Sequence, residues 1–184
     1  MDMYEVVKNS KGFGFIDMIK MDKKPGLIME FGVYSGKSIT DIAVYNQQTI
    51  YGFDSFEGLP EWWMPGYDAG HFKCDVPDVP KNVVLVKGYF SDTLPTFIVE
   101  HPEPVSLMHI DCDLYSSTKC IFDNFKNKFQ DGSIIIFDEL IDYGDQIWRE
   151  HEYKAFNEFL EETKYRWDCI GRYGGHQAGF IIYK

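Results

Sequence analysis

The sequence is short of cysteine, of positive charge and of long apolar segments. Its four cysteines include no CxxC pair, so we expect free thiols in a reducing compartment and no soft-metal site. Lys and Arg number 18 against 29 Asp and Glu, a balance that would repel a nucleic-acid backbone. No segment matches a membrane span or the core of a signal peptide. We therefore expect a soluble, cytoplasmic protein with neither a nucleic-acid nor a membrane partner.

The sequence also lacks internal repeats, linkers and low-complexity segments. Hydrophobic residues make up 45% of the 184 positions, and this length suits one domain with a full core. We therefore expect a single domain over residues 1–184, with a short helical segment at residues 1–24.

Short apolar runs alternate with helical patterns along the chain. This alternation predicts an α/β fold in which helices cover both faces of a parallel sheet. The last two runs have no helix between them, so we expect them to be antiparallel neighbours. The predicted strands are Leu27–Phe31, Thr49–Phe53, Asn82–Lys87, Ser106–Asp111, Ser133–Asp138, Tyr165–Gly171 and Ala178–Tyr183. The predicted helices are Tyr4–Met21 with an interruption at 12–14, Lys37–Tyr45, Thr93–Glu100, Ser116–Phe129 and Trp148–Thr163.

Two of the predicted strands end in pairs of acids. Asp111 and Asp113 lie at the end of one strand, and Asp138 and Glu139 at the end of the next. The carboxyl ends of parallel strands face one crevice, where such sheets bind ligands. Unpaired buried carboxylates are costly, so four of them at this edge indicate a divalent cation bound by hard oxygen ligands.

The loop after the first strand reads EFGVYSGKS, from Glu30 to Ser38, and two interpretations compete. Its Gly-x-x-x-Gly-Lys-Ser pattern is one residue short of a Walker A phosphate loop, which changes how the backbone N–H groups converge. The alternative is an adenosyl cofactor that is not a phosphate ester. Glu30 would then meet a cationic amino group, and Asp54, after the second strand, would accept hydrogen bonds from a ribose diol. The two acids favour S-adenosylmethionine, although Gly32 and Gly36 would also suit a simple strand–helix turn.

Five motifs occur in a fixed order: EFGVYSGKS, FDSFEGLP, GYFSDTLP, HIDCDLYSST and IIIFDE. In this order they resemble the macrocin-O-methyltransferase-like family, class I methyltransferases that act on hydroxyl groups of sugars and natural products. DSFEGLP and DCDLYSST are specific motifs, whereas the glycine loop is not. The resemblance implies a Rossmann-like, doubly wound, mostly parallel seven-stranded sheet with an antiparallel final strand. It also implies S-adenosylmethionine as methyl donor and Mg²⁺ as a required cation.

The resemblance further implies a role for each matching residue. Asp111, Asp138 and Glu139 would be the metal ligands, and Asp113 would be the general base. Capping of the following helix is the alternative role for Asp113. The residues expected to bind the cofactor are Glu30, Gly32, Gly36, Ser38, Asp54, Ser55, Phe90, Ser91 and Asp111.

The chain departs from the family pattern in three places. The N-terminal extension that covers the family's active site is short here, the aromatic stretch Glu61–Lys81 is reduced, and Glu139 stands where the family usually has Asp. A homodimer, in which a second copy replaces the missing cover, is therefore kept as an expectation. Residues 55–81 are expected to form a substrate lid that includes Trp62, Trp63, Met64 and Tyr67, with packing onto the domain as the alternative.

The function expected from these residues is an S-adenosylmethionine-dependent O-methyltransferase. Its acceptor would be a small sugar-like or natural-product molecule, whose hydroxyl is deprotonated with the help of Mg²⁺. The alternatives are a nucleotide-binding enzyme of the phosphate-loop type and a non-catalytic protein that binds S-adenosylmethionine. His109 is expected to be a packed core histidine, and His71, His151 and His176 are alternative bases.

Overall fold

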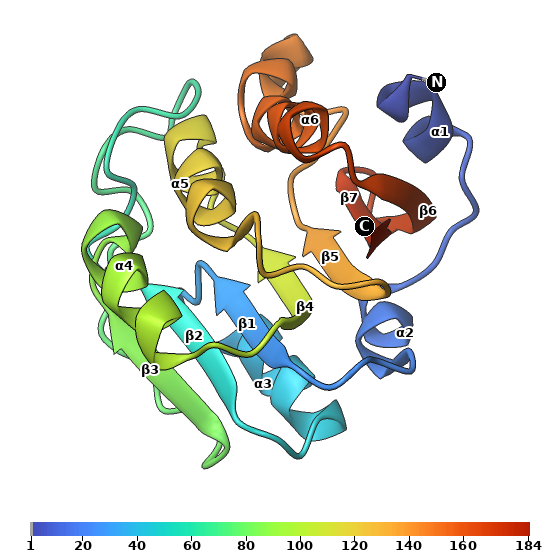
Figure 1. Cartoon of the computed structure of the whole chain (residues 1–184). Helices are drawn as coiled ribbons and strands as arrows, with labels where there is room; N and C mark the ends of the chain where they lie inside the picture. Colours follow the sequence, from blue (N-terminus) through green and yellow to red (C-terminus); the bar gives the residue numbers. More distant parts are fainter. Residues whose placement is uncertain (1) are drawn as a thin grey trace.

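Seven strands form one sheet in the computed structural model, which describes residues 2–184 (Figure 1). The strand order is β3-β2-β1-β4-β5-β7-β6. All neighbours from β3 to β5 are parallel, and β7 is antiparallel to both β5 and β6. The structure therefore confirms the predicted mostly parallel seven-stranded sheet with an antiparallel final strand. The strands are β1 (Leu27–Phe31), β2 (Ile50–Asp54), β3 (Val83–Lys87), β4 (Val105–Ile110), β5 (Ser133–Phe137), β6 (Arg166–Tyr173) and β7 (Gln177–Tyr183).

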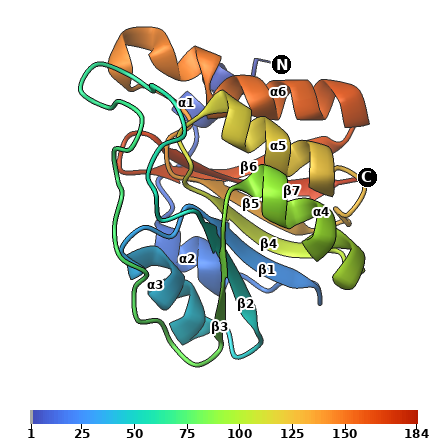
Figure 2. The same ribbon diagram turned by 90° about the vertical axis from the view of Figure 1, so that its left-hand side faces the viewer.

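Helices cover both faces of the sheet (Figure 2). Helices α4, α5 and α6 lie on one face, and α2 and α3 lie on the other, so the fold is doubly wound. None of the helices described in residues 2–184 is long and apolar enough to cross a membrane. The helices are α1 (Met3–Lys8), α2 (Phe15–Lys20), α3 (Lys37–Tyr45), α4 (Phe90–Glu100), α5 (Tyr115–Phe125) and α6 (Glu152–Thr163), with a 3₁₀ segment at Gly144–Glu150.

Alternation along the central strands divides the apolar side chains between two cores. In β1, Met29 and Phe31 contribute to the core under α4, α5 and α6, whereas Ile28 contributes to the core under α2 and α3. Every residue of β1, β4 and β5 is buried, as expected for central strands covered on both sides. Burial of each large apolar side chain in these strands stabilises the fold by roughly 1.5–3 kcal/mol.

The N-terminal segment differs from the single interrupted helix that we predicted. It forms two separate helices, because residues 11–13 run along β6 instead of continuing a helix. The N–H of Phe13 donates to the carbonyl of Arg172, and the N–H of Arg172 donates to the carbonyl of Lys11. A side chain at Gly171 would meet the Cβ of Phe13 at 2.6 Å, so glycine permits this close pairing.

Gly32, directly after β1, packs closely against Asp111, directly after β4. Its φ of 91° lies in the region that favours glycine, and a Cβ there would approach the carbonyl oxygen of Asp111 to 1.7 Å. The N–H of Asp111 in turn donates to the carbonyl of Phe31 at 2.9 Å. These contacts fix the glycine loop and the first predicted acid against one another.

Substitution of Gly32 tests this coupling. We expect Gly32→Ala to lower the free energy of unfolding by about 2 kcal/mol or more, because strain at positive φ and the clash with Asp111 add together. Gly66→Ala is the matched control, since Gly66 has the same φ of 91° and a Cβ there would meet no atom within 4 Å. It should lose only about 1–2 kcal/mol. Urea denaturation measures both, and equal losses would contradict the coupling.

Candidate functional site

A cavity of about 720 Å³ lies at the carboxyl ends of β1, β2 and β4. Its walls come from the glycine loop, the start of α4, the start of α5 and the loop between β2 and β3. The predicted site residues that line it are Gly32, Asp54, Ser55, Phe90, Ser91, Asp111, Asp113 and Glu139. The predicted residues that are not part of its wall are Glu30, Gly36, Ser38 and Asp138.

Asp54 binds the glycine loop directly. Its Oδ2 accepts hydrogen bonds from the N–H groups of Val33 and Tyr34, both at 2.8 Å. Its Oδ1 accepts another from the N–H of Phe56 at 2.7 Å. The side chain of Asp54 is therefore held in one orientation at the cavity wall, and its carboxylate occupies the two loop N–H groups.

Glu30 lies beneath the loop rather than on the cavity surface. It is fully buried, and its Oε1 accepts a hydrogen bond from the hydroxyl of Ser38 at 2.9 Å. Its Oε2 lies 3.3 Å from Nδ1 of His109, which is itself buried. Burial raises the pKa of Glu30, while the contact with His109 opposes that rise. The sequence did not indicate that the motifs EFGVYSGKS and HIDCDLYSST meet through this pair of side chains.

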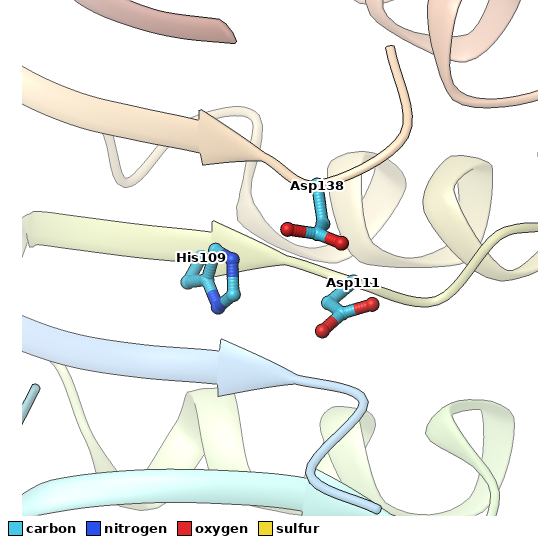
Figure 3. A group of neighbouring side chains, drawn as sticks. All are labelled: His109, Asp111 and Asp138. Atoms are coloured by element: carbon cyan, nitrogen blue, oxygen red, sulfur yellow. The ribbon is translucent and has the colours of Figure 1, made fainter. Parts of the chain in front are cut away.

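Four acids gather between the ends of β4 and β5, as predicted, in two groups that share Asp111. One group brings Asp111, Asp113 and Glu139 together, with one ligand atom from each within 4.8 Å of the others. The second group brings together His109, Asp111 and Asp138 within the same distance, at the ends of neighbouring strands (Figure 3). The three predicted metal ligands are thus divided between the groups, and His109 is an additional member.

The negative charge of this cluster is poorly compensated. Burial raises the pKa of Asp111 well above its usual range, opposed by His109 and reinforced by Asp138. Burial and the neighbouring carboxylates of Asp138 and Asp111 raise the pKa of Glu139. Within residues 2–184, no Lys or Arg forms an ion pair with any of the four acids.

The donor set fits a divalent cation. Oε2 of Glu139 is buried without a hydrogen-bond partner among the described residues. Carboxylate oxygens are the ligands that hard cations such as Mg²⁺ prefer. A cation between the ends of β4 and β5 would therefore supply both the missing partner and the missing positive charge.

Asp113 sits on a tight turn at the cavity wall. Its φ is 64°, and across it the N–H of Leu114 donates to the carbonyl of Cys112 at 2.6 Å. The N-terminus of α5 is capped at Leu114 with no side-chain hydrogen bond, so the capping role considered for Asp113 is not observed. Burial, with a contribution from Asp138, raises the pKa of Asp113 to about 7.

Glu152 is a site residue that sequence reasoning missed. This fully buried side chain, at the start of α6, accepts hydrogen bonds from the N–H groups of Cys112 and Asp113 at 3.2 and 3.1 Å. Burial raises its pKa well above the usual range. The signal was present, because Glu152 lies four residues before Phe156 on the apolar face of its helix.

The loop between β2 and β3 lines the cavity with aromatic side chains. Trp63, Met64 and Tyr67 form part of the wall, and the N–H of Trp63 donates to the carbonyl of Tyr67 at 3.0 Å. Trp63 is buried, whereas Trp62 is 52% exposed and is not part of the wall. The loop thus packs onto the domain through most of its aromatic residues and also bounds the cavity.

The strand order, with its antiparallel β7, is that of a Rossmann-like methyltransferase fold. A family model described as a methyltransferase domain matches residues 29–140, which is more than half of the chain. The chain therefore belongs to this methyltransferase-domain family, and the family relationship predicted from the motifs is confirmed.

Known relatives agree with this assignment. Demethyldecarbamoylnovobiocin O-methyltransferase of Streptomyces niveus is 28% identical over 142 residues, which are 62% of this chain and 53% of that protein. The chain thus spans about half the length of this curated relative. The crystal structure of CalS11, described as a calicheamicin methyltransferase and a TDP-rhamnose 3'-O-methyltransferase, is 28% identical with a TM-score of 0.69. The matched region covers 85% of this chain and 72% of the CalS11 chain. The O-methyltransferase NovP, at 22% identity, a TM-score of 0.64 and coverage of 87% and 73%, shares the fold.

The role of Glu152 is tested by two substitutions. Glu152→Gln keeps an oxygen acceptor and resembles the protonated acid, so we expect its thermal stability to stay close to that of the unaltered protein. Glu152→Ala leaves the N–H groups of Cys112 and Asp113 buried without partners, which should cost about 1–3 kcal/mol for each. Thermal denaturation measures the stability, and hydrogen exchange at the two amides measures their protection. Equal stability of the two variants would contradict the role.

The acid cluster also predicts a pH-dependent effect of cations on stability. Asp113 has a pKa of about 7 when folded, against about 4 when unfolded, so the folded state holds its proton more tightly. The cation-free protein should therefore lose stability as the pH rises from about 4 through about 7. A cation held by the neighbouring acids favours the ionised form of Asp113, so Mg²⁺ should raise the melting temperature more at about pH 8 than at about pH 6. Scanning calorimetry tests this, and an equal or smaller effect at the higher pH would contradict it.

Proposed function

We propose that the chain transfers a methyl group from S-adenosylmethionine to a hydroxyl group of a small sugar-like or natural-product acceptor. Membership of the methyltransferase-domain family supports the reaction class. The single observation that carries the proposal is the placement of Asp111, Asp113 and Glu139 together on the wall of the cavity that also reaches the glycine loop. One cavity is thus lined both by the glycine loop, where the cofactor would bind, and by a cluster of acids.

The cofactor would lie across the carboxyl ends of β1 and β2. Gly32 exposes backbone to the cavity, and the fixed carboxylate of Asp54 has acceptor capacity left for a ribose diol. Ser55, Phe90 and Ser91 would complete the ribose and adenine side. Because Glu30, Gly36 and Ser38 are not on the cavity wall, we assign them a supporting role beneath the loop.

The acids would prepare the acceptor hydroxyl. Asp111, Asp138 and Glu139 would hold Mg²⁺, which when bound supplies the Lewis acidity that lowers the pKa of a hydroxyl group. Asp113 would accept the hydroxyl proton, since its carboxyl lies beside Asp111 and Glu139 on the same wall. Glu152 keeps Asp113 in place through the backbone.

The aromatic loop would position the acceptor and exclude water. Trp63, Met64 and Tyr67 line the cavity, and the aromatic rings of Trp63 and Tyr67 are suited to pack against the flat faces of sugars or aromatic products. A fixed distance between the methyl group and the hydroxyl oxygen supplies much of the barrier reduction. A cytoplasmic location and a homodimer stay predictions, because this geometry depends on neither.

The phosphate-loop alternative is disfavoured by the contacts of the glycine loop. The N–H groups of Val33 and Tyr34, which a phosphate would need, already donate to Asp54. A phosphate would also meet the negative charge of that carboxylate at short range. The non-catalytic alternative has no comparable support, since a protein that only binds the cofactor has no need of the acids at the other end of the cavity.

Cofactor binding tests the proposed function. Isothermal calorimetry should detect S-adenosylhomocysteine binding to the full chain, and ATP should give no comparable heat. We expect Asp54→Asn to weaken S-adenosylhomocysteine, because the amide no longer accepts both loop N–H groups and the ribose. Absence of binding by the folded, unaltered chain would contradict the proposal.

The proposed base is tested separately from cofactor binding. Asp113→Asn should lower the rate of methyl transfer to a vicinal-diol probe such as catechol by about 10²–10⁴-fold, while the affinity for S-adenosylhomocysteine stays unchanged. Transfer of a radiolabelled methyl group measures the rate, and Asp123→Asn, a change on the exposed side of α5, is the control. An unchanged rate in Asp113→Asn would remove Asp113 as the base.

A further inference from the structure

His109 has a ring nitrogen that the proposed reaction does not use. The side chain is 1% exposed, and Nε2 has no hydrogen-bond partner among residues 2–184. Phe15 packs against the ring, with centroids 4.8 Å apart, and closes it off from that side. A buried polar atom without a partner costs free energy, and a ligand bound to this nitrogen would offset that cost.

The other ring nitrogen is held by Glu30. Nδ1 of His109 lies 3.3 Å from Oε2 of Glu30, whose second oxygen is bound by the hydroxyl of Ser38. A carboxylate that accepts the Nδ1 proton leaves the lone pair on Nε2 and increases its basicity. This arrangement of carboxylate and imidazole is the one that orients metal-binding histidines.

A ring nitrogen of His109 lies close to the carboxylates of Asp111 and Asp138. One ligand atom from each of the three side chains lies within 4.8 Å of the others, a spacing that one ion can bridge. Figure 3 shows the three side chains converging from the ends of β4 and β5. Asp111 and Asp138 lack ion pairs with Lys or Arg in the described part of the chain.

We propose that His109 is a nitrogen ligand of the cation held by Asp111 and Asp138, and that the site therefore prefers a divalent first-row transition ion such as Mn²⁺ or Co²⁺ over Mg²⁺. Oxygen ligands alone suit Mg²⁺, whereas an imidazole nitrogen favours transition ions. Glu30, beneath the glycine loop, acts as the positioning residue for this ligand. The inference refines the metal part of the proposed function, and methyl transfer itself is not needed for it.

Spectroscopy on the full chain with Mn²⁺ alone tests the inference. Pulsed electron paramagnetic resonance of the bound ion should show coupling to an imidazole ¹⁴N. His109→Ala should abolish this coupling and weaken Mn²⁺ by at least about tenfold, with a much smaller change in Mg²⁺ affinity. His176→Ala is the matched control, because His176 is the histidine on the cavity wall, and it should keep the coupling.

A second variant tests the inference even if His109→Ala does not fold. Glu30→Gln keeps the buried ring and still offers an oxygen to Nδ1, so it should retain the ¹⁴N coupling and bind Mn²⁺ about 10–100-fold more weakly. Absence of coupling in the unaltered protein, or its loss in His176→Ala, would overturn the inference. Mn²⁺ binding through His109 by a chain that binds no S-adenosylhomocysteine would instead contradict the proposed function and leave this inference intact.

Discussion

Four carboxylates at the ends of two adjacent strands, none of them paired with a Lys or Arg of residues 2–184, are the constraint on which the rest of this site depends. Taking such groups out of water is costly unless they are protonated or bound by a cation. The fold fixes them nonetheless, because the N–H of Asp111 binds the end of β1 and the N–H of Asp138 binds the carbonyl of Ile110. The backbone therefore positions the acids whether or not a ligand is present.

The same contacts couple the acids to the glycine loop. Gly32 lies against the carbonyl of Asp111, and Glu30 reaches His109 beneath them. Movement at the loop would thus be transmitted to the acids through backbone contact. This coupling gives a physical reason why a cofactor bound at β1 and an acceptor bound at β4 and β5 would be held at a fixed separation, as a direct methyl transfer needs.

Much of this arrangement was predictable because hydrophobic runs and strand order are local signals. The buried run from Leu27 to Phe31 and the acids at Asp111 and Asp138 follow from pattern alone, since parallel strands bring their carboxyl ends together. The side-chain contacts made around these residues could not be predicted from the sequence pattern. The pairing of Glu30 with His109 joins positions 79 residues apart, and no periodicity specifies such a contact.

Boundaries were predicted less well than the elements themselves. Helix α6 begins at Glu152, not at Trp148, because a 3₁₀ segment with two positive-φ residues precedes it. Helix α5 ends at Phe125, four residues before the predicted Phe129, although Phe129 is still buried. In both places a buried aromatic residue lies just outside the helix, so apolar periodicity extended the prediction too far.

A crystal structure of the full chain with S-adenosylhomocysteine and Mn²⁺, recorded with anomalous scattering, tests the central claim most directly. The account predicts an anomalous peak beside Asp111, between the ends of β4 and β5, and the adenosyl ligand across the ends of β1 and β2. No peak beside Asp111 in a structure that contains the bound adenosyl ligand would contradict it.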